Sequence, residues 1–308
     1  MQVAVDTVRV ALERRVESLG FDPPAAALLA DHFLDAELRG AATHGVGRMR
    51  WLAGFTDLRP SAAPVLAERA EGIARYDAAG ALGYLALAGA LDAELAQPPE
   101  GARLVVVGGC FPTGRLGWFA ERAARRGMAA LVWATSTPRI VHPSGGPPLL
   151  GTNPFCLALP GEPPTVVDVS MGRVTYGEVL RAAAAGERLA EGAAVRPDGS
   201  AELDPSEVIA NRAGIAPLGG YLSHKGFALA LIVELLASAL TPVEGHTACV
   251  LLARPRSQPA DAMRRALEGR HFPGDGGAEA ARRALARGTL ELDDELWAWL
   301  DGPTTPAR

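Results

Sequence analysis

The residues of this chain best suited to chemistry are a histidine and an arginine four positions apart, His44 and Arg48. They follow a helical stretch that Gly40 is expected to end, and Gly45 and Gly47 give the backbone after the histidine flexibility. Imidazole titrates near neutral pH, and a guanidinium group binds carboxylates with a permanent charge. The pair therefore suits a site that donates a proton while holding a carboxylate. The alternative is a surface loop histidine without a role.

Length and composition predict an ordinary globular protein. The 308 residues are 48% hydrophobic and 21% charged, enough for a large core in two domains or one closely connected domain. A formal charge of −5 gives no electrostatic basis for binding nucleic acid or an anionic membrane. We expect no membrane-spanning segment. The three cysteines (Cys110, Cys156 and Cys249) lie in apolar surroundings, which predicts reduced, buried thiols and a cytoplasmic location.

Hydrophobic periodicity predicts an α/β protein that begins with helices. Residues 3–19, 22–40 and 51–58 form a helical hairpin or small bundle with His44 at its apex, and residues 61–72 form a connection. The later segments alternate between predicted strands (73–76, 104–107, 130–134, 156–159, 166–169 and 248–253) and predicted helices (80–95, 118–126 and 227–240). Residues 181–200 are interpreted as a surface excursion. The helix at 227–240 is apolar almost all round, so we expect it in the core.

Several polar loops follow these elements and could bind a ligand. The turn 135–138, which contains Thr137, follows a strand, and ligands of α/β sheets often lie at strand ends. Asp168 ends another strand. Lys225 is the single lysine among thirty basic residues, and it begins the 227–240 helix, where exposed N–H groups favour anions.

Established nucleotide and hydrolase motifs are absent from the sequence. The glycines after the 104–107 strand lack the spacing of a dinucleotide fingerprint, and no acidic residue follows at the distance that a ribose contact needs. No phosphate loop, nucleophile elbow or HExxH zinc helix is present. An ordinary Rossmann site is therefore rejected.

Four motifs in a fixed order nevertheless resemble one known family. They are ELRGAATHGVGR, LLGTNPFCLALP, VVDVSMG and LGGYLSHKGFALALIVELLASAL, and FPGDGG follows later. Together they resemble the malate/L-lactate dehydrogenase family, which is unrelated to Rossmann-fold dehydrogenases and includes relatives of 2,3-diketo-L-gulonate reductase, ureidoglycolate dehydrogenase and piperideine-2-carboxylate reductase. The resemblance implies a mixed-sheet, non-Rossmann NAD(P)-binding α/β fold. It also implies a homodimer with the active site near the subunit boundary.

The resemblance implies an N-terminal helical domain, residues 1–70, joined by C-terminal helices at 278–302. Residues 71–277 would form the cofactor-binding and catalytic domain. His44 matches the family's proton donor and Arg48 its substrate-carboxylate partner, while Thr43 replaces a serine but keeps a hydroxyl. The residues expected to contact NADH or NADPH are Thr137, Asp168, Val169, Ser170, Met171, His224, Lys225, Gly274, Asp275 and Gly276, and those expected at the substrate are Thr43, Arg48, His142 and Thr152.

The chain departs from the family in two places. The loop at 109–114 lacks the second histidine that members usually carry, and the segment after Thr241 is short. His142 is a candidate replacement, with a plain loop residue as the alternative. The predicted function is NAD(P)H-dependent reduction of a small-molecule 2-oxo acid or cyclic 2-imino acid to the 2-hydroxy or 2-amino acid. The alternative is a protein of this fold that has lost hydride transfer and serves as a binding or non-redox catalytic module.

Overall fold

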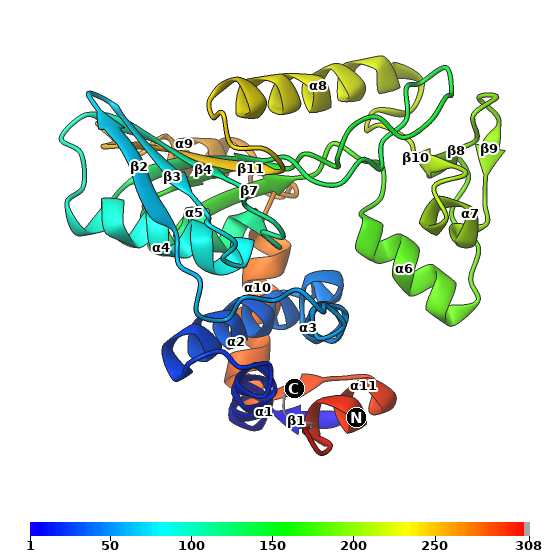
Figure 1. Cartoon of the computed structure of the whole chain (residues 1–308), viewed down its shortest axis with the longest axis horizontal. Helices are drawn as coiled ribbons and strands as arrows, with labels where there is room; N and C mark the ends of the chain where they lie inside the picture. Colours follow the sequence, from blue (N-terminus) through cyan, green and yellow to red (C-terminus); the bar gives the residue numbers. More distant parts are fainter. Residues whose placement is uncertain (305–308) are drawn as a thin grey trace.

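A computed structural model describes residues 1–304 of the chain as three packed regions (Figure 1). The first is helical and contains both ends of the described chain. Its elements are β1 (Gln2–Ala4), α1 (Val5–Glu17), α2 (Pro23–Leu38), η1 (Ala42–His44), α3 (Val46–Leu52), α10 (Asp275–Arg287), β12 (Thr289–Glu291) and α11 (Asp294–Asp301). Strand β1 pairs antiparallel with β12, and apolar residues of α1, α2, α3, α10 and α11 share one core. The C-terminal elements therefore pack with the N-terminal helices.

A seven-stranded sheet forms the centre of the molecule. Its strands are β2 (Val65–Ala70), β3 (Ile73–Asp77), β4 (Ala102–Gly108), β5 (Ala129–Ala134), β6 (Phe155–Leu159), β7 (Thr165–Val169) and β11 (Thr247–Ala253), in the order β2-β3-β4-β11-β5-β6-β7. Only β3 and β4 are parallel neighbours. Since a Rossmann site requires consecutive parallel strands, this topology agrees with the rejection of that site.

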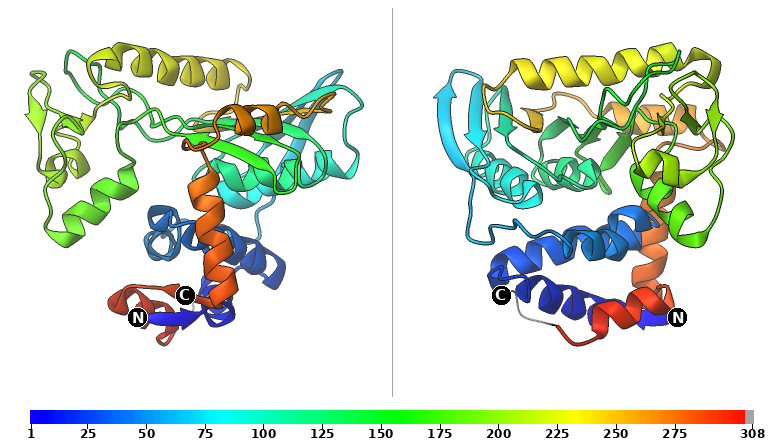
Figure 2. Two further views of the ribbon diagram at one scale, coloured as in Figure 1. Left: turned by 180° about the vertical axis from the view of Figure 1, so that it is seen from behind. Right: turned by 45° about the vertical axis from the view of Figure 1, so that its right-hand side comes forward.

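Helices cover both faces of this sheet. Helices α4 (Gly83–Ala96) and α5 (Leu116–Ala124) pack on one face through the largest apolar cluster. Helix α8 (Ser223–Ala239) covers the other face, where Val233 and Ala237 contact Val106, Trp133 and Cys249 (Figure 2). The N-terminal helices lie beyond α4 and α5, so that α2 faces the loop between β4 and α5. Helix α9 (Pro259–Ala266) follows β11.

A smaller unit extends from the end of β7. It contains α6 (Tyr176–Ala185), β8 (Ala194–Val195), β9 (Ala201–Glu202), α7 (Pro205–Ile209) and β10 (Gly214–Ile215), and η2 (Gly220–Leu222) leads from it into α8. Its three strands form a sheet with the order β10-β8-β9, and it has an apolar core of its own. Residues 181–200 are mostly exposed, as expected of a surface excursion, but they belong to a folded unit that the sequence did not predict.

Three further sequence predictions differ from the structure. Residues 61–72 contain the edge strand β2, whose side chains are all exposed, so no burial pattern marks it in the sequence. Helix α3 ends at Leu52 instead of continuing to Leu58. Helix α8 is not enclosed by the core: Gly226, Ala230, Val233 and Ala237 are its only buried residues.

The exposed side of α8 is apolar. The exposed residues include Leu229, Leu231, Ile232, Leu235 and Leu236. By length and composition alone, the segment Gly220–Ala239 would suffice to cross a membrane, although no such segment was expected from the sequence. In the structure one side of this helix lies on the sheet, and its other apolar side is exposed.

Candidate active site

The segment carrying His44 and Arg48 is fixed by the helix that precedes it. The Asp22 side chain caps the start of α2, with Pro23 in its first turn. After α2 ends, the short helix η1 carries His44 directly into α3. The Val46 N–H, at the start of α3, donates to Glu37 Oε1 of α2 at 2.7 Å. A Cβ at Gly45 would overlap this carboxyl group, so glycine is required there.

His44 is half-buried and lines a cleft. Its Nδ1 lies 3.0 Å from the Thr43 hydroxyl oxygen, so this hydroxyl contacts the imidazole ring. Burial lowers the pKa of His44 to about 4, and the positive charges of Arg48 and Arg115 act in the same direction. Glu178 opposes them weakly. His44 is therefore neutral at pH 7 in the free protein.

Arg48 lines the same cleft without an acidic partner among residues 1–304. Its guanidinium carbon lies 3.5 Å from the centroid of the Trp51 ring, a cation–π contact that leaves the N–H groups at its edge available. The charge also acts on the buried Tyr84 hydroxyl, whose pKa burial raises and Arg48 lowers. A held but unpaired guanidinium is suited to a carboxylate ligand.

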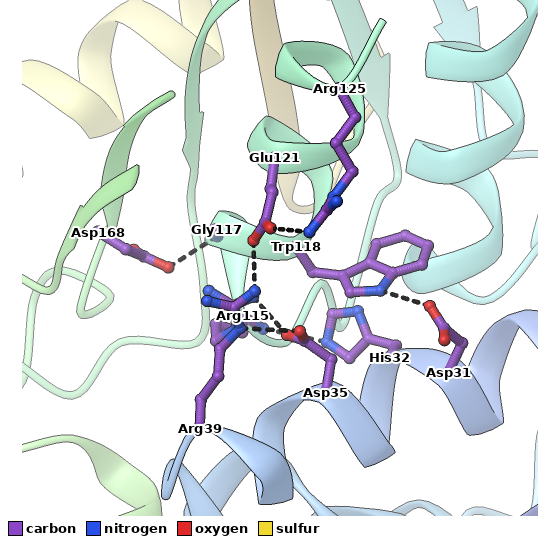
Figure 3. A network of polar contacts seen from close by, with 10 residues as sticks. All are labelled: Asp31, His32, Asp35, Arg39, Arg115, Gly117, Trp118, Glu121, Arg125 and Asp168. Carbon is purple, nitrogen blue, oxygen red and sulfur yellow. Dashed lines mark hydrogen bonds and ion pairs between the residues drawn. The ribbon is translucent and has the colours of Figure 1, made fainter. Parts of the chain in front are cut away.

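Two further cleft residues, Arg115 and Asp168, belong to a network of polar contacts (Figure 3). Arg115, from the loop between β4 and α5, forms an ion pair with Asp35, and its backbone N–H donates to His32 Nε2 at 3.2 Å. Asp168, at the end of β7, accepts the Gly117 N–H at 2.7 Å. Its carboxyl is open to the cleft but surrounded by protein on its other sides, so desolvation raises its pKa while Arg115 lowers it. The network thus fixes a carboxyl group at the cleft wall.

The cleft has a volume of about 660 Å³ and lies where the three regions meet. Of the predicted residues, Thr43, His44, Arg48, Thr137, Thr152, Asp168 and Ser170 line it. The loops at Thr137 and Thr152 are joined because the Thr152 N–H donates to the Ser136 hydroxyl at 3.2 Å. Segments distant in sequence are thereby combined in one site.

The remaining predicted residues lie outside the cleft lining. Met171 is buried, Val169 is exposed, and His142 is an exposed loop residue whose ring contacts Phe227. His224 and Lys225 are exposed at the start of α8, beside a turn whose Leu218 N–H donates to Met171 O. Residues 274–276 are the start of α10 and not a turn, and they pack against the backbone of β7: a Cβ at Gly274 would overlap Val166 O, and Asp275 pairs with Arg264. These segments border the β7 loop without reaching His44.

Sequence reasoning missed several residues that line the cleft. Arg115 and Glu178 act on the pKa of His44, and Arg139 stacks over Tyr176 at 4.0 Å on the α6 side. No local motif distinguishes these residues from other surface charges. The GxLGW pattern around Arg115 after a buried strand was the one available signal.

The fold is mixed α/β, and its cleft brings together a histidine, an arginine without an acidic partner among residues 1–304, and polar strand-end loops. Comparison with known proteins gives its family: residues 3–270 match the model of the family described as malate/L-lactate dehydrogenase. The chain belongs to this family. The family resemblance and the mixed α/β fold predicted from the sequence are confirmed.

Individual relatives are dehydrogenases and reductases. The chain is 35% identical over 232 residues to (2R)-3-sulfolactate dehydrogenase (NADP(+)) of Chromohalobacter salexigens, covering 73% of this chain and 68% of the relative. It is 34% identical to a Delta(1)-pyrroline-2-carboxylate/Delta(1)-piperideine-2-carboxylate reductase of Pseudomonas putida, covering 72% and 66%. The solved delta1-piperideine-2-carboxylate reductase of Pseudomonas syringae pvar. tomato superposes with a TM-score of 0.83 at 26% identity, covering 98% and 99%. The matches support the predicted class, an NAD(P)-dependent oxidoreductase.

Proposed function

We propose that the protein reduces the C=O or C=N bond of a 2-oxo acid or cyclic 2-imino acid, using NADH or NADPH. The observation that carries the proposal is the placement of His44 and the unpaired Arg48 in one cleft with Thr137, Asp168 and Ser170. A proton donor, a carboxylate holder and polar loops at strand ends are the parts this reaction requires.

Arg48 would bind the substrate carboxylate through its N–H groups and thereby orient the neighbouring carbon. The bound cofactor supplies the hydride that this carbon accepts. His44 would donate a proton to the developing alkoxide or amine, a contribution of about 10²–10⁴-fold in rate. The Thr43 hydroxyl, 3.0 Å from Nδ1, would hold the ring while the other nitrogen serves the substrate.

The pKa of His44 links substrate binding to proton donation. In the free protein burial, Arg48 and Arg115 keep the ring neutral. A carboxylate bound to Arg48 cancels part of that positive field and so raises the pKa of His44. Protonation of His44, which the reaction requires, is therefore favoured once the substrate is bound.

The residues around the cleft fit a nicotinamide cofactor. Thr137, Asp168 and Ser170 line the cleft, and Asp168 is held in place by Gly117. We assign the outer parts of the cofactor to the flanking segments. These are Val169, Met171, His224, Lys225, Gly274, Asp275 and Gly276. Lys225 offers a positive charge at the N-terminal end of α8, which suits a phosphate group.

We further propose that the enzyme is a cytoplasmic homodimer. Ile232 and Leu235 on the outer side of α8 are 58% and 61% exposed, and a second copy would bury this apolar surface. The three cysteines are free and buried, which suits a reducing compartment. We also propose two domains. The helical domain comprises residues 1–70 and 278–302, and the catalytic domain comprises residues 71–277.

The test uses purified protein, both reduced cofactors and a set of 2-oxo and cyclic imino acids. We expect saturable quenching of protein fluorescence by NADH or NADPH, and substrate-dependent loss of nicotinamide absorbance. His44→Ala should abolish most turnover and keep cofactor affinity. Among residues 1–304, His44 is the one histidine that lines the cleft, so the second histidine usual in the family is missing there. The competing function is therefore a protein that has lost hydride transfer. Absence of cofactor binding at millimolar concentration would favour it.

A further inference from the structure

We propose that the substrate carries a single anionic group, its carboxylate, and an apolar remainder. This excludes dicarboxylates and carboxylate–sulfonates as preferred substrates. The inference rests on the proposed function of the cleft. Three observations support it. The other cation near His44 is already paired, acidic residues line the cleft, and part of the cleft wall is apolar.

Arg48 is the one arginine near His44 that has no acidic partner in the described chain. The other cation that acts on His44, Arg115, is paired with Asp35 and lies near Asp168. Its side chain is only 13% exposed, and its Nε is buried. A second substrate anion would therefore have to compete with an existing ion pair.

The remaining cleft arginines lie on the α6 side. Arg139 stacks over Tyr176 and donates to Asn211 Oδ1 at 2.5 Å, while Arg181 pairs with Glu187 at 3.0 Å. Neither contributes to the pKa shift of His44. We therefore place both away from the reacting carbon.

Negative groups in the cleft oppose a second substrate anion. Asp168 is held at the wall by the Gly117 N–H, and desolvation already raises its pKa. Glu178, which caps α6 through the Thr175 N–H at 2.6 Å, also lines the cleft and acts on His44. A carboxylate or sulfonate placed near either group would be repelled in a partly desolvated site.

One part of the cleft wall is apolar. Trp51 packs against the Arg48 guanidinium, Phe111 and Pro112 line the same cleft from the loop between β4 and α5, and Leu116 lines it from the start of α5. Pro112 and Leu116 are buried. This wall occupies the loop in which the sequence lacks the second family histidine.

Two glycines hold this wall in position. A Cβ at Gly83 would lie 2.6 Å from both Phe111 N and Pro112 O, so α4 packs directly on the loop backbone. Gly114 has a φ of +66°, and a Cβ there would overlap Tyr84 and press on His32. The loop therefore cannot move outward into α2 or α4, and it presents a fixed apolar surface.

The experiment compares kcat/KM for pyruvate, 2-oxobutanoate and 2-oxopentanoate with that for oxaloacetate and sulfopyruvate, using the preferred cofactor. Each added methylene should raise kcat/KM about fourfold while the wall accommodates it. Oxaloacetate and sulfopyruvate should be at least about tenfold poorer than 2-oxobutanoate. Cyclic imino acids with one carboxylate belong to the favoured group.

Phe111→Lys adds a cation to the apolar wall, and Phe111→Leu is its matched control. We expect Phe111→Lys to raise the ratio of oxaloacetate to 2-oxobutanoate activity by about tenfold or more, and Phe111→Leu to leave it unchanged. Wild-type preference for oxaloacetate or sulfopyruvate would overturn the inference and leave the proposed reaction standing. Failure to reduce any of the acids would instead refute the proposed function.

Discussion

Replacing Arg48 by glutamine should raise the pKa of His44. The two side chains lie in one cleft, and Arg48 is the largest electrostatic cause of the low pKa after burial. Glutamine removes the charge but keeps a polar side chain of similar reach. Arg48→Lys is the matched control because it keeps the charge and loses the planar guanidinium.

The structure sets the size of the effect. The pKa of His44 falls from 6.5 to about 4, so protonating this ring costs about 3 kcal/mol more than in water. Because burial is the larger cause, removing Arg48 should recover less than half of this gap, about one pKa unit. His44 would still titrate below an exposed histidine.

The assay is an NMR titration of the imidazole signals of the six histidines, with His44 assigned from a His44→Asn variant. We expect the wild-type signal to titrate near pH 4, the Arg48→Gln signal about one unit higher, and the Arg48→Lys signal close to wild type. A wild-type midpoint near 6.5, or equal midpoints in the two Arg48 variants, would refute the electrostatic account of this site.

Three other predictions concern stability and assembly. Burial raises the pKa of Glu37 from 4.5 to about 7, so its stabilising contribution is complete below pH 4.5 and is lost as the pH rises through 7. As the pH rises from 4.5 to about 8, the unfolding free energy of Glu37→Gln relative to wild type should therefore increase by up to about 3 kcal/mol. A pH-independent difference in denaturant titrations would contradict this. Ile232→Asp should convert a dimer to a monomer in light scattering while Val10→Asp, at an equally exposed apolar site, should not; a wild-type monomer would sink the homodimer proposal. Gly274→Ala should lower the unfolding free energy by about 2 kcal/mol or more, because the φ of Gly274 is +91° and β7 leaves no space for a Cβ. Gly276→Ala, where a Cβ meets open space, should not lower it. Equal melting temperatures of the two variants would contradict the packing described.

The sequence allowed prediction of features that depend on neighbouring residues. His44 and Arg48 lie four residues apart in the chain, and the strands β4, β5, β6, β7 and β11 are short apolar runs with clear ends. The family motifs then supplied the class of fold and reaction, which the comparisons support. Local spacing and a chain-long set of motifs were sufficient for these conclusions.

Other features depend on contacts between distant segments. Arg115 enters the site because α2 binds both its backbone and its guanidinium, and no local pattern indicates this. Hydropathy alone cannot tell whether an apolar helix is enclosed by its own chain, so α8 was wrongly placed in the core. The edge strand β2 was missed because all its side chains are exposed.

The most direct test of the central claim follows a single hydride. Wild-type protein is mixed with reduced cofactor deuterated at the nicotinamide C4 position and with 2-oxobutanoate, and the product is analysed by mass spectrometry and NMR. We predict deuterium at C2 of 2-hydroxybutanoate, with a rate at least about 10²-fold lower for His44→Asn at unchanged cofactor affinity. Cofactor binding without deuterium transfer to any 2-oxo or cyclic imino acid, or equal rates for both proteins, would contradict the account.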